Sequence, residues 1–403
     1  MPGTETGLSC GRVDVLWDTT LAGYNFGPHH PMAPLRTDLT MRLARELGVL
    51  DQPNTALCPV PDVDEALLAR VHDPEYVRAV GRAGTDPLTV SWQYGLGTED
   101  NPVFAGMHAA AARICGASQA AAEAVWSGRA AHAVNIAGGL HHAARSAARG
   151  FCVYNDCAVA ITRLLELGAE RVAYVDVDVH HGDGVQELFY DDPRVLTVSL
   201  HETGRTLYPG TGFPNETGGP SAPGTVVNVA LEPGTTDSQW LRAFHAVVPH
   251  ALAAFQPQVL VTQHGCDSHA SDPLGHLSLS VDGQRAANAA LHQLAHQHAA
   301  GRWVVTGGGG YEVVQVVPRA WTLLLAEVVG VELDLRADLP VAWREYVLAT
   351  TGLHAPGRLT DGRQPAYRDF SAGYDPQDAV DRSILATRNA VFPALGLDPM
   401  VDL

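Results

Sequence analysis

The sequence predicts an α/β fold: a single large domain with a central, mostly parallel sheet covered by helices on both faces. Short runs of β-branched and apolar residues recur along the middle of the chain. Each run leads into a loop rich in Gly, His or Asp, and a helical segment follows. Continuous apolar runs of this kind are typical of buried parallel strands. The length of 403 residues fits one large domain with an extension.

The expected strands share a run of Val, Ile or Leu bounded by turn residues. In chain order they cover residues 13–17, 131–136, 172–177, 195–200, 226–229, 259–262 and 303–306. Long helices are expected at residues 103–126, 155–167 and 238–255. Two long loops, at residues 85–101 and 201–224, interrupt the alternation, and loops of this length are usually functional rims or disordered.

The alternation of strands and helices stops near Val331. A polar segment of helices and turns, with many Asp and Arg residues, follows it. We therefore expect a catalytic domain over residues 1–330 and a C-terminal extension over residues 331–403 that packs on or beside it.

Composition removes several classes of function. All 26 basic residues are arginines, which excludes chemistry that needs an ε-amine, such as a Schiff base or a P-loop lysine. A GC-rich genome is one explanation for the missing lysines, and an enzyme that works on lysine side chains is another. The net charge of −18 argues against nucleic-acid binding and favours a cationic partner.

Cysteine usage and hydropathy predict a cytoplasmic protein without membrane contact. The six cysteines form no CxxC pair, and the first residues carry neither a basic nor an apolar leader segment. No apolar run approaches the roughly twenty residues of a membrane span.

The strongest local signal is the segment RVAYVDVDVHHGDG at residues 171–184. Because side chains alternate along a strand, we expect Asp176, Asp178 and His180 to project to one face as the strand ends. Ionisable groups on a buried strand are costly unless something pairs them, and a divalent metal is the simplest partner. Asp267, which follows the strand at 259–262, supplies a third ligand beside Asp178 and His180.

Two carboxylates and one imidazole leave a coordination position for water, which is the catalytic pattern for zinc. The same ligands also suit Fe²⁺ or Mn²⁺. His264 and His269 compete as ligands from the same segment, although each alone fits a loop histidine better.

Proton-transfer groups are expected in AGGLHHA, at residues 137–143, where His141 and His142 follow a neighbouring strand. Each imidazole needs an acceptor on its far nitrogen, and Asp176 and Asp183 are the available carboxylates. The glycine run at residues 307–310 matches no nucleotide fingerprint, but the Tyr311 hydroxyl that follows it can donate to an oxyanion opposite the metal.

These strings together resemble the zinc-dependent histone deacetylase family, in a form closest to its class I branch and the bacterial acetoin-utilisation deacetylases. The strings are DVDVHHGDG, GGLHHA, GFCVYND, TVSLHE, YPGTG, GCDSHASDPLG and GGGGY. The resemblance runs from about Val13 to Gly330, some four-fifths of the chain. It implies the fold described above, which arginases share.

The resemblance also implies roles for single residues. Asp178, His180 and Asp267 match the family's zinc ligands, and Tyr311 matches the tyrosine that polarises the acetyl carbonyl. Arg36 matches the arginine of an internal channel through which acetate leaves.

The two histidines take different roles in this family. His141 matches the histidine paired with Asp176, and His142 matches the general acid/base paired with Asp183.

Further matches outline a tunnel for the acyl-lysine side chain. Phe151 and Tyr208 match its walls, Gly150 lies beside the substrate chain, Leu274 stands at the mouth, and Asp100 matches the rim aspartate that holds the substrate backbone. The family usually has Phe in place of Tyr208, so the tunnel keeps its aromatic wall and gains a hydroxyl, which bears on acyl selectivity.

The family carries a structural monovalent cation, usually K⁺, beside the zinc. The matching residues are Asp176, Asp178, His180, Ser199 and Leu200. A second cation site matches carbonyls near Phe189, Asp192, Val195 and Thr225.

Two departures from the family narrow the expected partners. Nuclear class I enzymes bind inositol phosphate through basic residues where this chain has Ala33 and Pro273, so we expect no such co-activator. Relatives specific for polyamines place an acidic residue where Leu274 stands, which disfavours a polyamine substrate.

The implied reaction is hydrolysis of Nε-acetyl-lysine in a protein, which releases acetate and free lysine. A metabolic enzyme such as an acyl-CoA synthetase is the expected substrate protein. Two alternatives stay open: deacetylation of acetylpolyamines, and an acyl-lysine binding module without catalysis. The second would need a broken ligand set or a missing tyrosine, and neither is seen.

Overall fold

One central sheet of eight parallel strands organises the computed structural model, which describes residues 11–401. The strands lie in the order β2-β1-β3-β8-β7-β4-β5-β6, and every neighbouring pair is parallel. Their bounds are β1 (Val13–Leu16), β2 (Thr55–Cys58), β3 (His132–Asn135), β4 (Val172–Asp176), β5 (Val195–Glu202), β6 (Val226–Leu231), β7 (Val259–Gln263) and β8 (Trp303–Thr306). The expected α/β fold is confirmed.

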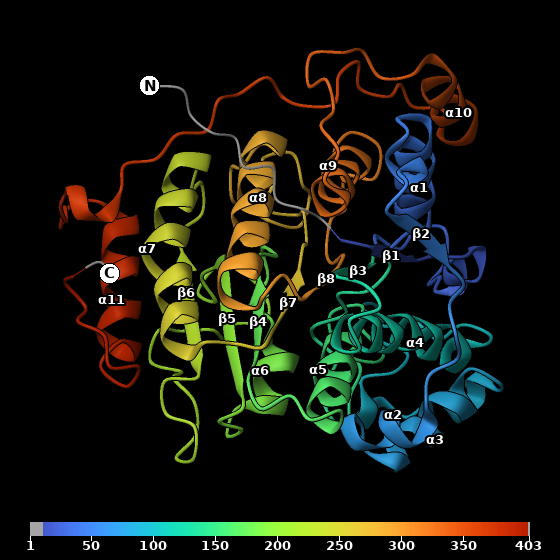
Figure 1. The fold of residues 1–403 in the computed structure, drawn as a ribbon. Coiled ribbons are helices and arrows are strands. Elements are labelled where there is room, and N and C mark those ends of the chain that lie inside the picture. The colour runs from blue at the N-terminus through green and yellow to red at the C-terminus, as the bar shows by residue number, and fades with distance from the viewer. Residues whose placement is uncertain (1–10, 402–403) are drawn as a thin grey trace.

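Helices cover both faces of this sheet (Figure 1). One layer holds α1 (Leu35–Glu46), α7 (Asp237–Phe255), α8 (Val281–His298) and α9 (Val317–Val329), with α10 (Val341–Thr351) and α11 (Ala379–Val391) at its ends. The other holds α2 (Glu65–Val71), α3 (Pro74–Ala83), α4 (Met107–Trp126), α5 (Asp156–Glu166) and α6 (Asp183–Phe189). Each layer closes its own hydrophobic core against the sheet. None of these described helices is both long and apolar enough to cross a membrane.

Some elements differ from the expectation. The sequence analysis missed β2, a four-residue edge strand whose side chains are mostly half-buried, so it lacks a clear apolar run. The loop at residues 85–101 contains two 3₁₀ turns, Pro87–Thr89 and Trp92–Tyr94. Helix α4 begins at Met107, after Gly106 in a left-handed conformation, and not at residue 103. Such a glycine suits a sharp turn into the helix.

Residues 331–401 pack closely against the rest of the chain. Helix α11 lies against α7 and β6 (Figure 1), and a buried ion pair joins Arg242 Nη2 of α7 to Asp381 Oδ2 at 2.8 Å. Asp361 in the preceding loop accepts hydrogen bonds from His269 at 3.0 Å and Arg319 at 2.8 Å. The C-terminal segment therefore braces the loop that follows β7.

The arrangement of strands brings the polar motifs together. Strands β3, β8, β7 and β4 are consecutive neighbours at the centre of the sheet, and all four run in the same direction. Each of them leads at its carboxyl end into one of the motifs singled out above, at residues 137–142, 307–311, 264–267 and 177–183. Ligand sites of open parallel sheets lie beyond these ends.

Candidate active site

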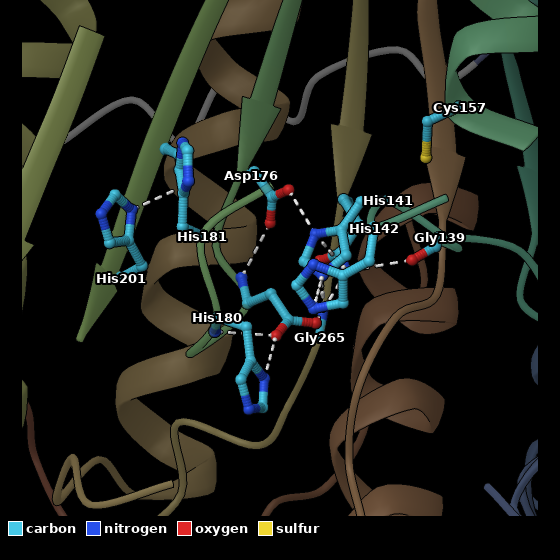
Figure 2. A network of polar contacts seen from close by, with 12 residues as sticks. Gly139, His141, His142, Cys157, Asp176, His180, His181, His201 and Gly265 are labelled. Carbon is cyan, nitrogen blue, oxygen red and sulfur yellow. Dashed lines mark hydrogen bonds and ion pairs between the residues drawn. The ribbon is translucent and has the colours of Figure 1, made fainter. Parts of the chain in front are cut away.

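Four loops converge beyond the carboxyl ends of the central strands and bring together buried histidines and aspartates. Figure 2 shows His141, from the β3 loop, directed toward Asp176 at the end of β4, with His142 beside it and His180 nearby. All four side chains are buried. A buried polar cluster at this edge of the sheet is a functional site candidate on physical grounds.

Asp178, His180 and Asp267 form a set that can hold a metal ion. Each offers one ligand atom, these atoms lie within 4.8 Å of one another, and all three residues are buried. His180 Nδ1 is 3.1 Å from Asp178 Oδ1 and 3.1 Å from Asp267 Oδ2. The structure thus brings the three expected ligand residues together.

The route to this arrangement differs from the expected one. Strand β4 ends at Asp176, so Asp178 and His180 lie in the bends that follow and not on a strand face. Val177 and Val179 are buried, as expected. Backbone hydrogen bonds fix the bend: Asp178 N–H donates to Asp176 Oδ1, and Val179 N–H donates to Asp267 Oδ1 at 2.9 Å.

The charges of this set fit a divalent cation. Burial and the neighbouring Asp178 raise the pKa of Asp267 to about 7. Burial would lower the pKa of His180, but hydrogen bonds and charge from Asp178 and Asp267 outweigh it and raise that pKa to about 10. Holding both carboxylates ionised therefore needs more positive charge than one imidazolium supplies. Two carboxylates and an imidazole suit Zn²⁺, Fe²⁺ or Mn²⁺.

Two glycines leave the space that these carboxylates need. A Cβ on Gly309 would lie 1.9 Å from Asp267 Oδ2, and one on Gly265 would lie 2.0 Å from Asp178 Oδ2. Gly309 N–H also donates to Asp178 Oδ2 at 2.8 Å. The glycine-rich segment after β8 thus packs directly against the carboxylates of the candidate metal site.

Two histidine–aspartate pairs lie beside the metal set. His141 Nδ1 donates to Asp176 Oδ2 at 2.7 Å, and His142 Nδ1 donates to Asp183 Oδ1 at 2.6 Å. The Nε2 atoms of the two imidazoles are 3.1 Å apart. The structure therefore makes both pairings that the sequence led us to expect.

The two imidazoles differ in protonation. Burial lowers the pKa of His141, but the charges of Asp176 and Asp178 outweigh it and raise the pKa to about 9. Burial and the positive charge on His141 lower the pKa of His142 to about 4. The pKa values make His141 the charged ring and His142 the neutral ring at neutral pH, so His142 is the member of the pair that can accept a proton.

Tyr311 lies across the same cavity. Asp272 Oδ2 accepts its backbone N–H at 2.7 Å, and its ring meets the edge of Phe151 with the ring centres 5.6 Å apart. Among the described residues, no hydrogen-bond partner takes its hydroxyl. Burial and the charge of Asp267 raise its pKa well above the usual range, so the group stays a neutral donor.

A cavity of about 250 Å³ connects these groups to the surface. Its lining residues are Asp100, His142, Gly150, Phe151, His180, Leu207, Tyr208, Leu274 and Tyr311. The structure thus brings all five expected tunnel residues to one cavity. A Cβ on Gly150 would lie 2.4 Å from the His142 ring, so only glycine fits there.

The mouth of the cavity combines an aromatic wall with an acidic rim. Tyr208 is 43 % exposed, and the edge of its ring meets His142 with the ring centres 5.1 Å apart. Asp100 is exposed, and its carbonyl oxygen lies 3.2 Å from the His30 ring. The His30 ring in turn packs against Phe151 with ring centres 4.6 Å apart.

Ser199 and Leu200 stand on β5 beside this site. Ser199 is the register partner of Asp176, and its Oγ is 2.8 Å from His201 Nδ1. The carbonyl of Gly212 accepts from His201 Nε2 at 2.9 Å, which leaves His201 Nδ1 to accept the Ser199 proton. The Ser199 oxygen therefore presents lone pairs next to Asp176, as a cation ligand must.

Arg36 lies buried behind Tyr311. Its guanidinium donates to the carbonyls of Gly308 and Gly310 at 3.1 and 2.9 Å, and it stands 5.8 Å from the centre of the Tyr311 ring. It also lines a small cavity with Tyr24, Met32 and Leu140. Its buried Nε has no hydrogen-bond partner among the described residues.

Several site residues were missed by the sequence analysis. Gln263, the last residue of β7, donates to Asp178 Oδ2 at 2.7 Å, and the Tyr174 hydroxyl donates to Asp176 Oδ2 at 2.7 Å. A polar residue at the end of an apolar strand was the available signal for Gln263. Leu207 and His30 lie in or beside the tunnel, and no local pattern indicated them. The competing histidines are not ligands: His264 bonds Asn288 and Thr262, and His269 bonds Asp361.

Comparisons with known proteins agree with this geometry. The histone deacetylase domain family matches residues 30–328. The acetoin utilization protein AcuC of Bacillus subtilis (strain 168) is 42% identical over 322 residues, which are 79% of this chain and 82% of that protein. The AcuC of Staphylococcus xylosus is 36% identical over 325 residues, 80% of this chain and 84% of that protein.

A solved structure from the same family is also similar to this chain. The crystal structure of a histone deacetylase homologue from Aquifex aeolicus superimposes with a TM-score of 0.80 at 27% identity. The match covers 93% of this chain and all of the other.

Proposed function

Because this chain belongs to the histone deacetylase family, we propose that it hydrolyses the acetyl amide of Nε-acetyl-lysine in protein substrates, releasing acetate and free lysine. One observation carries the proposal. A single cavity joins an exposed rim at Asp100 and Tyr208 to the buried groups His142, His180 and Tyr311. An acyl-lysine side chain fits such a cavity, because its apolar stem can lie along the tunnel while its terminal amide reaches the buried polar groups.

Asp178, His180 and Asp267 would hold a catalytic metal, which we propose is Zn²⁺, with Fe²⁺ or Mn²⁺ as alternatives. When bound there, such an ion supplies a Lewis acid for the amide carbonyl and lowers the pKa of water. Gln263 and the Gly309 N–H hold the Asp178 carboxylate in place through hydrogen bonds.

His142 moves the proton in the proposed mechanism. Its Nε2 is the free base of the pair, and Asp183 fixes the tautomer by accepting from Nδ1. His142 takes a proton from the attacking water and delivers it to the leaving lysine nitrogen. His141, held by Asp176, stays charged and stabilises the negative charge that develops nearby.

Tyr311 donates to the oxygen of the acetyl group as it becomes an oxyanion. The uncommitted hydroxyl and the fixed backbone of Tyr311 support this assignment. The tunnel wall made by Gly150, Phe151 and Tyr208 orients the acyl-lysine, with Leu274 at the mouth.

Asp100 at the rim would bind the backbone of the substrate. Together with Glu99 and a net charge of −18, it favours peptides with basic flanks. We expect peptides with Arg beside the acetyl-lysine to react faster than peptides with Glu there at low salt, with the difference shrinking as salt rises. Equal rates at low salt would remove this part of the proposal.

Two further elements complete the proposed site. K⁺ would bind Asp176, Ser199 and the carbonyls of Asp178, His180 and Leu200, and the orientation of the Ser199 hydroxyl supports this. Arg36 would attract the acetate product into the small cavity behind Tyr311.

By analogy with relatives named for acetoin utilization, we propose a cytoplasmic metabolic enzyme such as an acyl-CoA synthetase as the substrate protein. We propose neither nucleic acid nor inositol phosphate as a partner.

Comparing two substrates tests the proposal. We expect the purified enzyme to release acetate from an acetyl-lysine peptide at least tenfold faster, in kcat/KM, than from N-acetylspermidine. The aliphatic side chain of Leu274 at the mouth offers no charge to a polyamine. A preference for N-acetylspermidine would replace the protein substrate by a polyamine, and no release from either would leave only a binding module.

A further inference from the structure

Three histidines cluster at the opposite edge of the sheet from the active site. His132 is the first residue of β3, and His292 and His296 lie in the last turns of α8. Each offers a ring nitrogen, and these atoms lie within 4.8 Å of one another. His132 and His292 are buried and His296 is half-buried. The active site lies beyond the carboxyl end of β3, so the two clusters are separate.

The spacing of the ring nitrogens fits tetrahedral coordination. Zinc binds imidazole nitrogen at about 2.0–2.1 Å, so two ligands of a tetrahedral ion lie about 3.3–3.4 Å apart. His132 Nε2 and His296 Nε2 are 3.3 Å apart. These two nitrogens are therefore separated by the distance expected of two ligands of one tetrahedral ion.

The outer nitrogens of two of these histidines are held as in metal sites. His132 Nδ1 lies 2.9 Å from the carbonyl of Val328, which can only accept, so the lone pair of the neutral ring is on Nε2. His292 Nδ1 donates to Glu327 Oε1 at 2.7 Å. A carbonyl or carboxylate behind each imidazole is the arrangement that orients metal-binding histidines.

The electrostatic surroundings favour a cation. Helix α8 ends at His298 and α9 ends at Val329, so both helices direct the negative ends of their dipoles toward the cluster. The Glu327 carboxylate adds a full negative charge nearby. Burial lowers the pKa of His132 to about 4 and also lowers that of His296, so these rings are neutral and able to act as ligands.

The remaining contacts make the cluster rigid. The His292 ring stacks on Trp303 of β8 with the ring centres 5.2 Å apart. A Cβ on Gly301 would lie 3.1 Å from the His296 ring, so the turn after α8 closes tightly over it. The ligand atoms are thus positioned by β3, β8 and the ends of two helices.

We propose that His132, His292 and His296 form a second metal site, which takes a divalent ion of the Zn²⁺ class and completes its coordination with water. Three imidazoles select such borderline ions over Mg²⁺ or Ca²⁺. The ion ties the start of β3 to the C-terminal end of α8, and it takes no part in hydrolysis.

Counting zinc in a chain whose active-site ligands are removed tests this site alone. The background is the double substitution Asp178→Asn with Asp267→Asn, stripped with EDTA, reloaded with Zn²⁺ and desalted. We expect one zinc per chain by elemental analysis. Adding His296→Gln should remove it, whereas adding His298→Gln, a half-buried control on the same helix, should leave it in place. A background chain without zinc, or zinc that survives His296→Gln, would overturn the proposal.

Thermal unfolding gives a second readout. Zn²⁺ should raise the melting temperature of the background chain and of the His298→Gln chain, but not of the His296→Gln chain, because an ion that binds only the folded state stabilises it. An equal melting temperature with and without Zn²⁺ in all three would mean that the histidines form only a hydrogen-bonded cluster, against the proposal.

Activity separates this result from the proposed function. His296→Gln in an otherwise unchanged chain should keep the wild-type deacetylase rate while it loses one zinc. If the enzyme failed to hydrolyse acetyl-lysine, the number of zinc ions bound per chain would still test the second metal site independently.

Discussion

Replacing Tyr311 by Phe isolates the contribution of one hydroxyl to catalysis. Phe keeps the ring against Phe151, the backbone bond to Asp272 and the contact with the Arg36 guanidinium. No described residue loses a hydrogen-bond partner, so the folded state should be undisturbed. Removal of an oxyanion donor costs roughly 10²–10³ in rate, or about 2.7–4 kcal/mol of transition-state stabilisation. We therefore expect kcat to fall by that factor.

The assay is acetate release from an acetyl-lysine peptide, with KM, metal content and melting temperature measured on the same sample. KM should change less than about threefold and the metal content not at all, because the hydroxyl acts mainly in the transition state. Tyr346→Phe is a matched control, because it removes a tyrosine hydroxyl that donates to Asp38 of α1 and does not line the tunnel. Wild-type turnover in Tyr311→Phe, or loss of its metal, would refute the assignment.

Three further substitutions test the site and its support. Asp178→Asn should remove both the active-site metal and the activity, and unchanged zinc at the site, measured with His296→Gln also present, would count against the ligand set. Gly150→Ala places a Cβ 2.4 Å from the His142 ring at a φ of +49°. We expect kcat to fall at least tenfold and the free energy of unfolding to fall by about 1–3 kcal/mol. A wild-type rate would show that the tunnel accommodates a side chain at this position. Asp361→Asn removes the negative charge and one of the two carboxylate oxygens that accept from His269 and Arg319, which should cost about 1–3 kcal/mol by urea unfolding at pH 7. These partners lower the pKa of Asp361 despite its burial. The carboxylate therefore stabilises the folded state fully above its unfolded pKa of about 3.9, and this stabilisation is lost as the pH falls from there through the folded pKa. A loss of stability in Asp361→Asn that is as large at pH 3 as at pH 7 would contradict an electrostatic cause.

The sequence predicted the sheet well because most of its strands are fully buried. Strands β4 and β7 each begin with an apolar run and are buried at every position, as in a sheet covered on both faces. β2 was missed for the same reason, since an edge strand of four partly exposed residues has neither a buried run nor a clean alternation.

Polar motifs at strand ends predicted much of the candidate site. Asp178, His180 and Asp267 could be grouped because parallel strands place their carboxyl ends at one edge of a sheet. The bend after Asp176 could not be predicted, since it depends on hydrogen bonds to a carboxylate 88 residues further along the chain.

Other site residues depend on distant packing that leaves no local pattern. Leu207 lines the tunnel only because its loop folds back over the site, and the Tyr174 hydroxyl reaches Asp176 within the buried sheet. The histidines of the second cluster come from β3 and α8, and their meeting depends on how these elements pack.

In the proposed mechanism, a metal held by Asp178, His180 and Asp267 enables this site to hydrolyse acetyl-lysine. The most direct test of this role is acetate release from an acetyl-lysine peptide by purified enzyme stripped with a chelator and then titrated with Zn²⁺. We predict that stripping abolishes the activity and that Zn²⁺ restores it, but not in a chain carrying Asp267→Asn. A stripped enzyme that keeps its full rate, or an Asp267→Asn chain that regains activity with Zn²⁺, would contradict this role of the metal.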